Sequence, residues 1–203
     1  MNSRTKMRLG PTVPAIAFLV GAFAVSGCSG ESNRDDSSIR LPKRVCWNAF
    51  EGEKVEDLLP RGGDATIDDR LDFDLYKSKQ SASCLVYVDG NTKFSASANR
   101  NAQSPEDIDW STWKSANPSS INAGDKGISW STRFSSGAAA YFTCERPSSL
   151  PSEEAHWPNS YKYIELELRA SGPAKPKEAQ KRISSLMDDF VNFSKRKLKC
   201  KVQ

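Results

Sequence analysis

The sequence predicts an α+β domain with two disulfides. We expect an antiparallel sheet of about six strands, with a short N-terminal helix and a long C-terminal helix packed on one face. Three observations lead to this fold class. Apolar and polar residues alternate in several segments in the middle of the chain, as half-buried strands require. Turn residues separate these segments, as in hairpins. Helical spacing of apolar residues is confined to the two ends of the domain.

Residues 1–27 have the pattern of a bacterial lipoprotein signal peptide. Three cations and no acid precede an apolar run at 13–25, and Val25-Ser26-Gly27-Cys28 follows. This order is a positive n-region, an h-region and a small-residue cleavage site. The motif resembles the lipobox, so we expect an acylated Cys28 as the first mature residue. Two alternatives are ordinary cleavage that leaves Cys28 free, and an uncleaved anchor, for which the apolar run is short.

Residues 28–43 are predicted to be a disordered tether, because they are almost without apolar side chains and cannot offset the entropy of ordering. A single domain is expected over 44–203. Without the three cations of the signal, 26 Lys and Arg face 25 Asp and Glu. Such a near-neutral chain gives no reason to expect a nucleic acid partner.

The first half of the domain is predicted to hold one helix and three strands. Apolar residues at helical spacing predict a helix over 47–59, which Pro60-Arg61-Gly62-Gly63 ends. Asp89-Gly90-Asn91 is a hairpin signal, since these residues accept the positive φ of tight turns. Strands are predicted at 70–75, 84–88 and 93–98.

The second half begins with an irregular stretch over 99–127, in which Ser104-Pro105-Glu106-Asp107 looks like the start of a short helix. A turn is expected at Ser135-Ser136-Gly137. The last helix, from about 176 to 199, has its apolar residues on one face. Strands are predicted at 128–134, 139–144 and 164–169.

Four cysteines remain once Cys28 carries lipid. An even number in an exported chain indicates two disulfides, with three possible connectivities. The spacing is too wide for a zinc site or a Cys-x-x-Cys redox pair. If each bridge joins one end of a helix to the sheet, the pairing is Cys46–Cys84 and Cys144–Cys200, which we favour.

Five short motifs resemble those of small actinobacterial surface lipoproteins of unknown function, and the resemblance covers most of the mature chain. They are Cys46, Leu58-Leu59-Pro60, Cys84-Leu-Val-Tyr-Val-Asp-Gly90, Tyr141-Phe-Thr-Cys144 and Leu198-Lys-Cys200. Related lipoproteins are often assigned a PsbP-like α+β fold, so the resemblance implies that fold here. It implies no catalytic residue.

One candidate ligand site lies in the irregular stretch, where carboxylates and aromatic rings are close in sequence: Asp107, Asp109, Trp110, Trp113 and Trp130. Rings that stack on a sugar, with polar groups that bind its hydroxyls, would make a glycan site. The alternative is that Trp110 and Trp113 hold a short helix on the sheet. The two aspartates would then favour the helix N-terminus rather than act as acid and base.

A second candidate is the basic cluster Lys195, Arg196 and Lys197, which could contact an anionic surface. The alternative is that these cations stabilise the C-terminus of the last helix. His156 is the one histidine of the chain and has no second histidine or cysteine nearby. We therefore predict no metal site and no cofactor.

No catalytic motif of a hydrolase or nucleotide-binding protein is found. We expect a non-catalytic domain, lipid-anchored on the extracytoplasmic face of the cell membrane, that binds an envelope protein or glycan. The alternatives are a small-molecule or glycan receptor that uses residues 110–130 and, more remotely, an envelope hydrolase.

Overall fold

The computed structural model describes residues 39–70, 72–76, 80–101, 104, 111, 114, 121–123, 127–132, 134–145, 162–172 and 176–200. Its main element is a seven-stranded antiparallel sheet in the order β3-β4-β5-β9-β8-β7-β6. The strands are β3 (Ala65–Asp68), β4 (Ser81–Val88), β5 (Asn91–Asn101), β6 (Ile121–Asn122), β7 (Gly127–Ser131), β8 (Ser135–Thr143) and β9 (Tyr163–Ser171).

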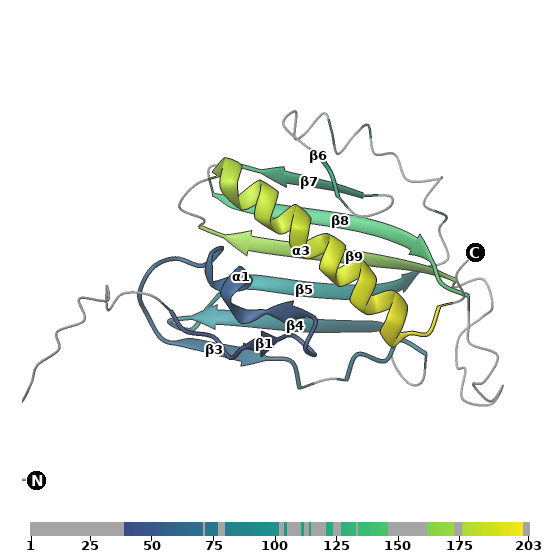
Figure 1. Ribbon diagram of the computed structural model, residues 1–203, viewed down its shortest axis with the longest axis horizontal. Helices are drawn as coiled ribbons and strands as arrows, with labels where there is room; N and C mark the ends of the chain where they lie inside the picture. The colour runs from purple at the N-terminus through teal and green to yellow at the C-terminus, as the bar shows by residue number, and fades with distance from the viewer. Residues whose placement is uncertain are drawn as a thin grey trace, which may run out of the picture. The chain divides into compact units, whose positions relative to one another are not determined.

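Both described helices lie on the same face of this sheet, as Figure 1 shows. α1 (Gly52–Glu56) follows a two-stranded pair, β1 (Arg44–Val45) and β2 (Phe50–Glu51), and this unit covers β4 and β5. α3 (Pro176–Lys197) crosses β7, β8 and β9. The predicted α+β class is confirmed, with one strand more than expected because the two-residue β6 adds an edge.

The core lies between the helices and the sheet. In β4, β5 and β9, every second side chain is buried and faces the helices, as alternation in the sequence predicts. The apolar face of α3 supplies Ile183, Leu186, Met187 and Phe190, none more than 1% exposed. Six aromatic rings, Trp47, Phe50, Phe73, Phe94, Phe190 and Phe193, contact one another beneath α3 and join the N-terminal unit to it.

The predicted disulfide pairing is confirmed. Cys46–Cys84 joins the β1–β2 loop to β4, with 5.4 Å between the Cα atoms. Cys144–Cys200 joins the end of β8 to the residue that follows α3 by three positions, with 4.8 Å between the Cα atoms. Each bridge therefore attaches the covering layer to the sheet, the arrangement from which the pairing was predicted.

The helix predicted over 47–59 is wrong for most of its length. Residues 46–49 form a turn, 50–51 form β2, and only 52–56 are α-helical. The apolar residues are buried as a helical face would be, but in a hairpin that places Trp47 and Phe50 in the aromatic cluster. Helical spacing over so short a range does not distinguish these two structures.

The strand predicted at 70–75 is also wrong, since the edge strand β3 lies earlier, at Ala65–Asp68. The Asp74 carboxylate accepts the Tyr76 N–H at 3.0 Å, and the Asp74 N–H donates to the Asp72 carbonyl at 2.8 Å. These local bonds bend the backbone out of an extended conformation. Phe73 and Leu75 are nevertheless buried.

The turn expected at 135–137 lies at 132–135 instead. The Thr132 hydroxyl accepts the N–H groups of Phe134 and Ser135, and the Thr132 N–H donates to the Ser135 carbonyl at 2.7 Å. Threonine in this position closes a tight turn through its own side chain. Ser135, Ser136 and Gly137 are therefore the start of β8.

The packed domain includes part of the expected tether. Ile39 is 5% exposed and belongs to the core, and the Leu41 N–H donates to the Glu56 carboxylate. The boundary expected at residue 43 therefore lies too late in the chain. Leu41 also packs against the core, and the Gly52 N–H donates to the Lys43 carbonyl at 3.0 Å, so several contacts hold residues 39–43 beside α1.

Candidate functional site

The face of the sheet opposite the helices has no covering element among the described residues, and we call it the open face. Its side chains come from alternate residues of five strands, β4, β5, β9, β8 and β7. Three rows cross the sheet: Leu85, Ser95, Arg169 and Gly137; Ser83, Ser97, Glu167 and Ala139; Ser81, Asn99, Glu165 and Tyr141.

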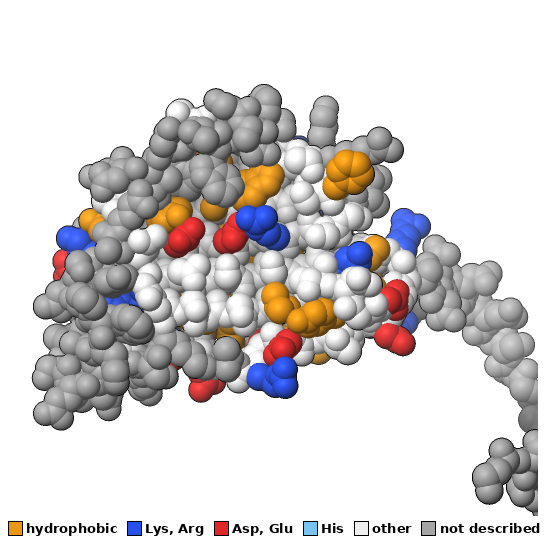
Figure 2. Space-filling view, turned by 180° about the vertical axis from the view of Figure 1, so that it is seen from behind, with side chains coloured by type: hydrophobic (Ala, Val, Ile, Leu, Met, Phe, Trp, Pro, Cys, Tyr) orange, Lys and Arg blue, Asp and Glu red, His pale blue; other side chains and the backbone are white. Residues whose placement is uncertain are grey.

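Most of these side chains are polar, and all but Gly137 and Ala139 are half-buried or exposed. In Figure 2, which views this face, the middle of the described surface is mostly white, with apolar and charged side chains scattered around it. A sheet face that needs a helix to cover it is lined with large apolar side chains. The open face is instead a broad, wettable surface.

Trp130 lies on the open face but does not present a free ring in the way the predicted glycan site required. It is 8% exposed and packs with Ile128 and Ala139. Its indole occupies the space over Gly137: a Cβ built on that glycine would lie 2.4 Å from Trp130 Cζ2. Trp130 is thus part of a small second core on this face.

The other members of the predicted glycan site, Asp107, Asp109, Trp110 and Trp113, lie outside the described residues. Two neighbours in that stretch, Ser111 and Lys114, have helical backbone, in agreement with the short helix expected there. The ligand site is therefore not assembled by the described residues, and it stays a prediction.

Charged side chains on the open face are paired with one another. Arg169 Nε donates to the Glu167 carboxylate at 2.7 Å. Burial raises the pKa of Tyr141 well above its usual range, and a hydrogen bond with the Glu165 carboxylate, the residue opposite on β9, raises it further. Tyr141 therefore stays neutral near pH 7, and its hydroxyl donates a hydrogen bond to the Glu165 carboxylate.

A buried arginine lies at the end of the sheet near the Cys144–Cys200 bridge. The Arg100 guanidinium is stacked over the Tyr76 ring at 4.5 Å, and the Tyr76 hydroxyl donates to the Cys144 carbonyl at 3.1 Å. Burial raises the pKa of Tyr76 to about 12, although the charge of Arg100 lowers it. Arg100 is thus held by an aromatic ring and supports the corner of the sheet.

Sequence reasoning missed a strained loop between β1 and β2. Cys46, Trp47 and Asn48 have φ values of 51°, 59° and 66°, a left-handed backbone in three successive residues other than glycine. The Trp47 N–H donates to the Asp69 carboxylate at 3.2 Å, and the Arg44 guanidinium donates to the Asn48 carbonyl. Such conformations persist only where the surroundings impose them. Neither Cys nor Trp signals them in a sequence.

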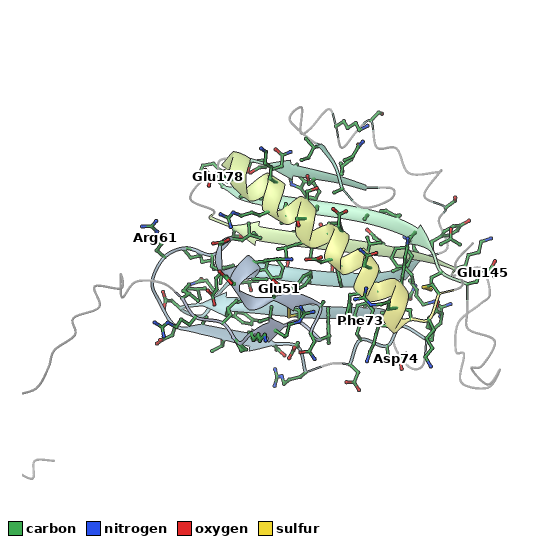
Figure 3. All side chains as sticks on the ribbon, in the orientation of Figure 1. Glu51, Arg61, Phe73, Asp74, Glu145 and Glu178 are labelled. Carbon is green, nitrogen blue, oxygen red and sulfur yellow. A yellow bond between two sulfur atoms is a disulfide. The ribbon has the colours of Figure 1, made fainter. Side chains whose placement is uncertain are left out.

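The basic cluster does not form one patch. Lys195 is half-buried, with its ammonium 5.5 Å from the centre of the Phe142 ring on β8. Lys197 projects from the opposite side of α3, because two residues turn a helix by about 200°. Arg196, Lys197 and Lys199 are exposed, and none of the three forms an ion pair with a described carboxylate. In Figure 3, Asp74 and Glu145 are labelled at this end of the molecule, and Glu178 lies at the other end of α3.

The described residues hold no group of three His, Cys, Asp or Glu side chains that could bind a metal ion. None of the helices among them is long and apolar enough to cross a membrane. The sites that the described part of the chain does offer are therefore surfaces: the open face, and the basic end of α3.

Comparison with known proteins adds no relative. No family model, curated protein or solved structure matches the chain.

Proposed function

We propose that this chain is a non-catalytic binding protein, held by lipid at the extracytoplasmic face of the cell membrane, which binds an envelope protein through the open face. The observation that carries the proposal is the composition of that face. Its long strands place short polar side chains beside half-exposed Leu85, Tyr87 and Tyr163, a mixture suited to reversible contact with another protein. Both described helices pack elsewhere.

Two other features support this proposal. The four paired cysteines fit an oxidising compartment, as the lipobox at Cys28 requires. The α+β fold agrees with the resemblance to small surface lipoproteins, for which a PsbP-like domain remains our proposal. The glycan receptor stays the alternative, but it would have to bind without the buried ring of Trp130.

Site-specific photo-crosslinking tests the binding surface. A photoreactive amino acid in place of Ser97, in the middle of the open face, should yield one defined protein adduct in whole cells. Ser185 is an exposed serine on the outer side of α3 and is the matched control. Equal labelling from both positions, or adducts from Ser185 alone, would contradict the proposed surface.

The anchor is tested by Cys28→Ala. The wild-type chain should fractionate with membranes and begin at an acylated residue 28, whereas the variant should accumulate as precursor or be released. If the wild-type chain stayed with membranes while its residue 28 carried no acyl group, the proposed anchor would be contradicted.

A further inference from the structure

The C-terminal end of α3 has a geometry that its sequence does not favour. The Cys200 N–H donates to the Lys195 carbonyl at 3.1 Å, and the Lys199 N–H donates to the Arg196 carbonyl at 3.2 Å. This pair of bonds is a Schellman motif, in which the residue at the Lys199 position is left-handed and is most often glycine. Here it is a lysine, with φ +53°.

A left-handed lysine is strained, because its Cβ approaches the following carbonyl, whereas glycine adopts this conformation freely. The side chain of Lys199 is exposed and has no acidic partner among the described residues. The next residue, Cys200, is fixed to β8 by its disulfide. Glycine would therefore suit this backbone at least as well as the lysine does.

Arg196 and Lys197 likewise have no acidic partner among the described residues, in contrast to Lys54 and Arg182 of the covering layer. Lys54 pairs with Asp189 at 3.0 Å, and Arg182 pairs with Asp57. The helix dipole favours cations at this end of α3, but at exposed positions the effect is modest, about 0.3–1 kcal/mol each, and it fixes no partner for the charge. Asp74 is an acidic residue near this end of α3, and its carboxylate accepts the Tyr76 N–H.

We propose that Arg196, Lys197 and Lys199 form a preorganised contact for the phosphate headgroups of an anionic phospholipid bilayer. This inference rests on the proposed lipid anchor at Cys28. The disulfide and the helix cap hold the backbone that carries the three cations, so little backbone ordering is required when they bind. Lys195 is not part of this contact because its ammonium lies over Phe142.

The length of chain ahead of the domain indicates a bilayer as the occupant. Ten residues separate Cys28 from Ile39, and the eleven steps from one to the other span about 40 Å at most. The chain enters the domain beside α1, where Leu41 binds Glu56. α3 is about 33 Å long, less than the extended span of this segment, so the segment is long enough to let the basic end of α3 meet the membrane that holds the lipid. The tether keeps the effective concentration high, so a weak contact is sufficient.

Vesicle co-sedimentation tests the contact separately from the anchor. The chain from residue 28 onward with Cys28→Ala should bind phosphatidylglycerol vesicles, not phosphatidylcholine vesicles, and less tightly as salt rises. The triple variant Arg196→Ala, Lys197→Ala, Lys199→Gly should bind about 100-fold more weakly, at about fivefold per cation. The control Lys43→Ala, Arg61→Ala, Lys181→Ala loses the same charge from exposed positions elsewhere and should weaken binding less than about fivefold.

Equal loss in both triple variants would overturn the proposal, because it would reflect net charge alone. Binding to soluble polyphosphate without binding to vesicles would overturn it in favour of an anionic polymer. Neither result bears on the anchor, which is decided by whether residue 28 of the membrane-bound wild-type chain is acylated.

The single variant Lys199→Gly separates folding from binding. It should keep or raise the melting temperature, because glycine accepts the left-handed backbone, and should weaken vesicle binding about fivefold. A lower melting temperature with unchanged vesicle binding would give Lys199 a purely structural role and overturn its part in the contact.

Discussion

Trp130 and Gly137 face each other across β7 and β8, and the glycine leaves the space that the indole fills. Gly137→Ala would place a methyl group 2.4 Å from Trp130 Cζ2. Because the ring also packs against Ile128 and Ala139, it cannot move away at no cost. We expect the free energy of unfolding to fall by about 1–3 kcal/mol, as measured by urea denaturation.

Two controls isolate this overlap. Gly172 has φ +77° and nothing within 4 Å of a built Cβ, so Gly172→Ala should show only the backbone penalty of about 1–2 kcal/mol. In a Trp130→Ala background, Gly137→Ala should cost almost nothing. If the cost persists there, the glycine is needed for its backbone and not for the indole.

Because the pKa of Tyr76 is raised, we expect the free energy of unfolding to fall in alkali. Burial raises its pKa in the folded chain to about 12, above the ordinary value of 10.0. Between these two pH values the unfolded chain releases the proton first, so the free energy of unfolding falls as pH rises. Below pH 10 this contribution is fully present.

Urea denaturation from pH 9 to 12 measures the effect. Tyr76→Phe should be less stable near neutral pH, because the hydrogen bond to the Cys144 carbonyl is lost, and should have a shallower decline in alkali. Tyr141→Phe is the companion variant, since the pKa of Tyr141 is raised too. A decline that neither variant changes would assign the effect to other groups.

Among the elements, aromatic packing rather than ion pairing should hold α1 and the β1–β2 loop to α3. Phe190 is fully buried and lies 5.4 Å from Phe50 and 6.0 Å from Phe73, measured between ring centroids. We expect Phe190→Ala to cost about 3–5 kcal/mol in thermal or urea unfolding. Lys54→Met breaks the 3.0 Å pair with Asp189 but should cost less than about 1 kcal/mol, since both side chains are about 40% exposed.

The bridge at the end of α3 should act on the stability of that element. The Cys144–Cys200 bridge closes a separation of 56 residues, for which the chain-entropy model gives about 4 kcal/mol. Replacing both cysteines by serine should lower the melting temperature markedly and speed hydrogen exchange in the last turns of α3. Uniform acceleration across β4 and β5 would instead show that the bridge stabilises the whole domain.

For the molecule as a whole, the sequence predicted those parts that follow from regular patterns. β5 and β9 alternate apolar and polar residues, and β4 contains a short apolar run. α3 has a long apolar face, and Asp89-Gly90 forms the expected hairpin with φ of 50° and 73°. The disulfide pairing followed from the layer arrangement. These features depend on local spacing, which a single sequence contains.

The rest depends on contacts between distant residues. The left-handed loop at 46–48 is imposed by a disulfide, by Asp69 and by the rings around Trp47. Trp130 was predicted as part of a ligand site, yet it is buried because a glycine seven residues later leaves room for it. The open face could not be located either, since which face the helices cover is set by their packing.

The two disulfides lie in separate halves of the chain, which has a consequence if the backbone is cleaved between them. Cys46–Cys84 lies wholly before Asn101, and Cys144–Cys200 lies wholly after Ile121. A single cleavage between these two residues would leave two internally bridged fragments with no covalent link between them. They meet where β5 pairs with β9 over residues 94–101 and 163–170, and in the aromatic cluster. The protein is thus a candidate for a split reporter, whose halves associate reversibly and separate in denaturant without reductant.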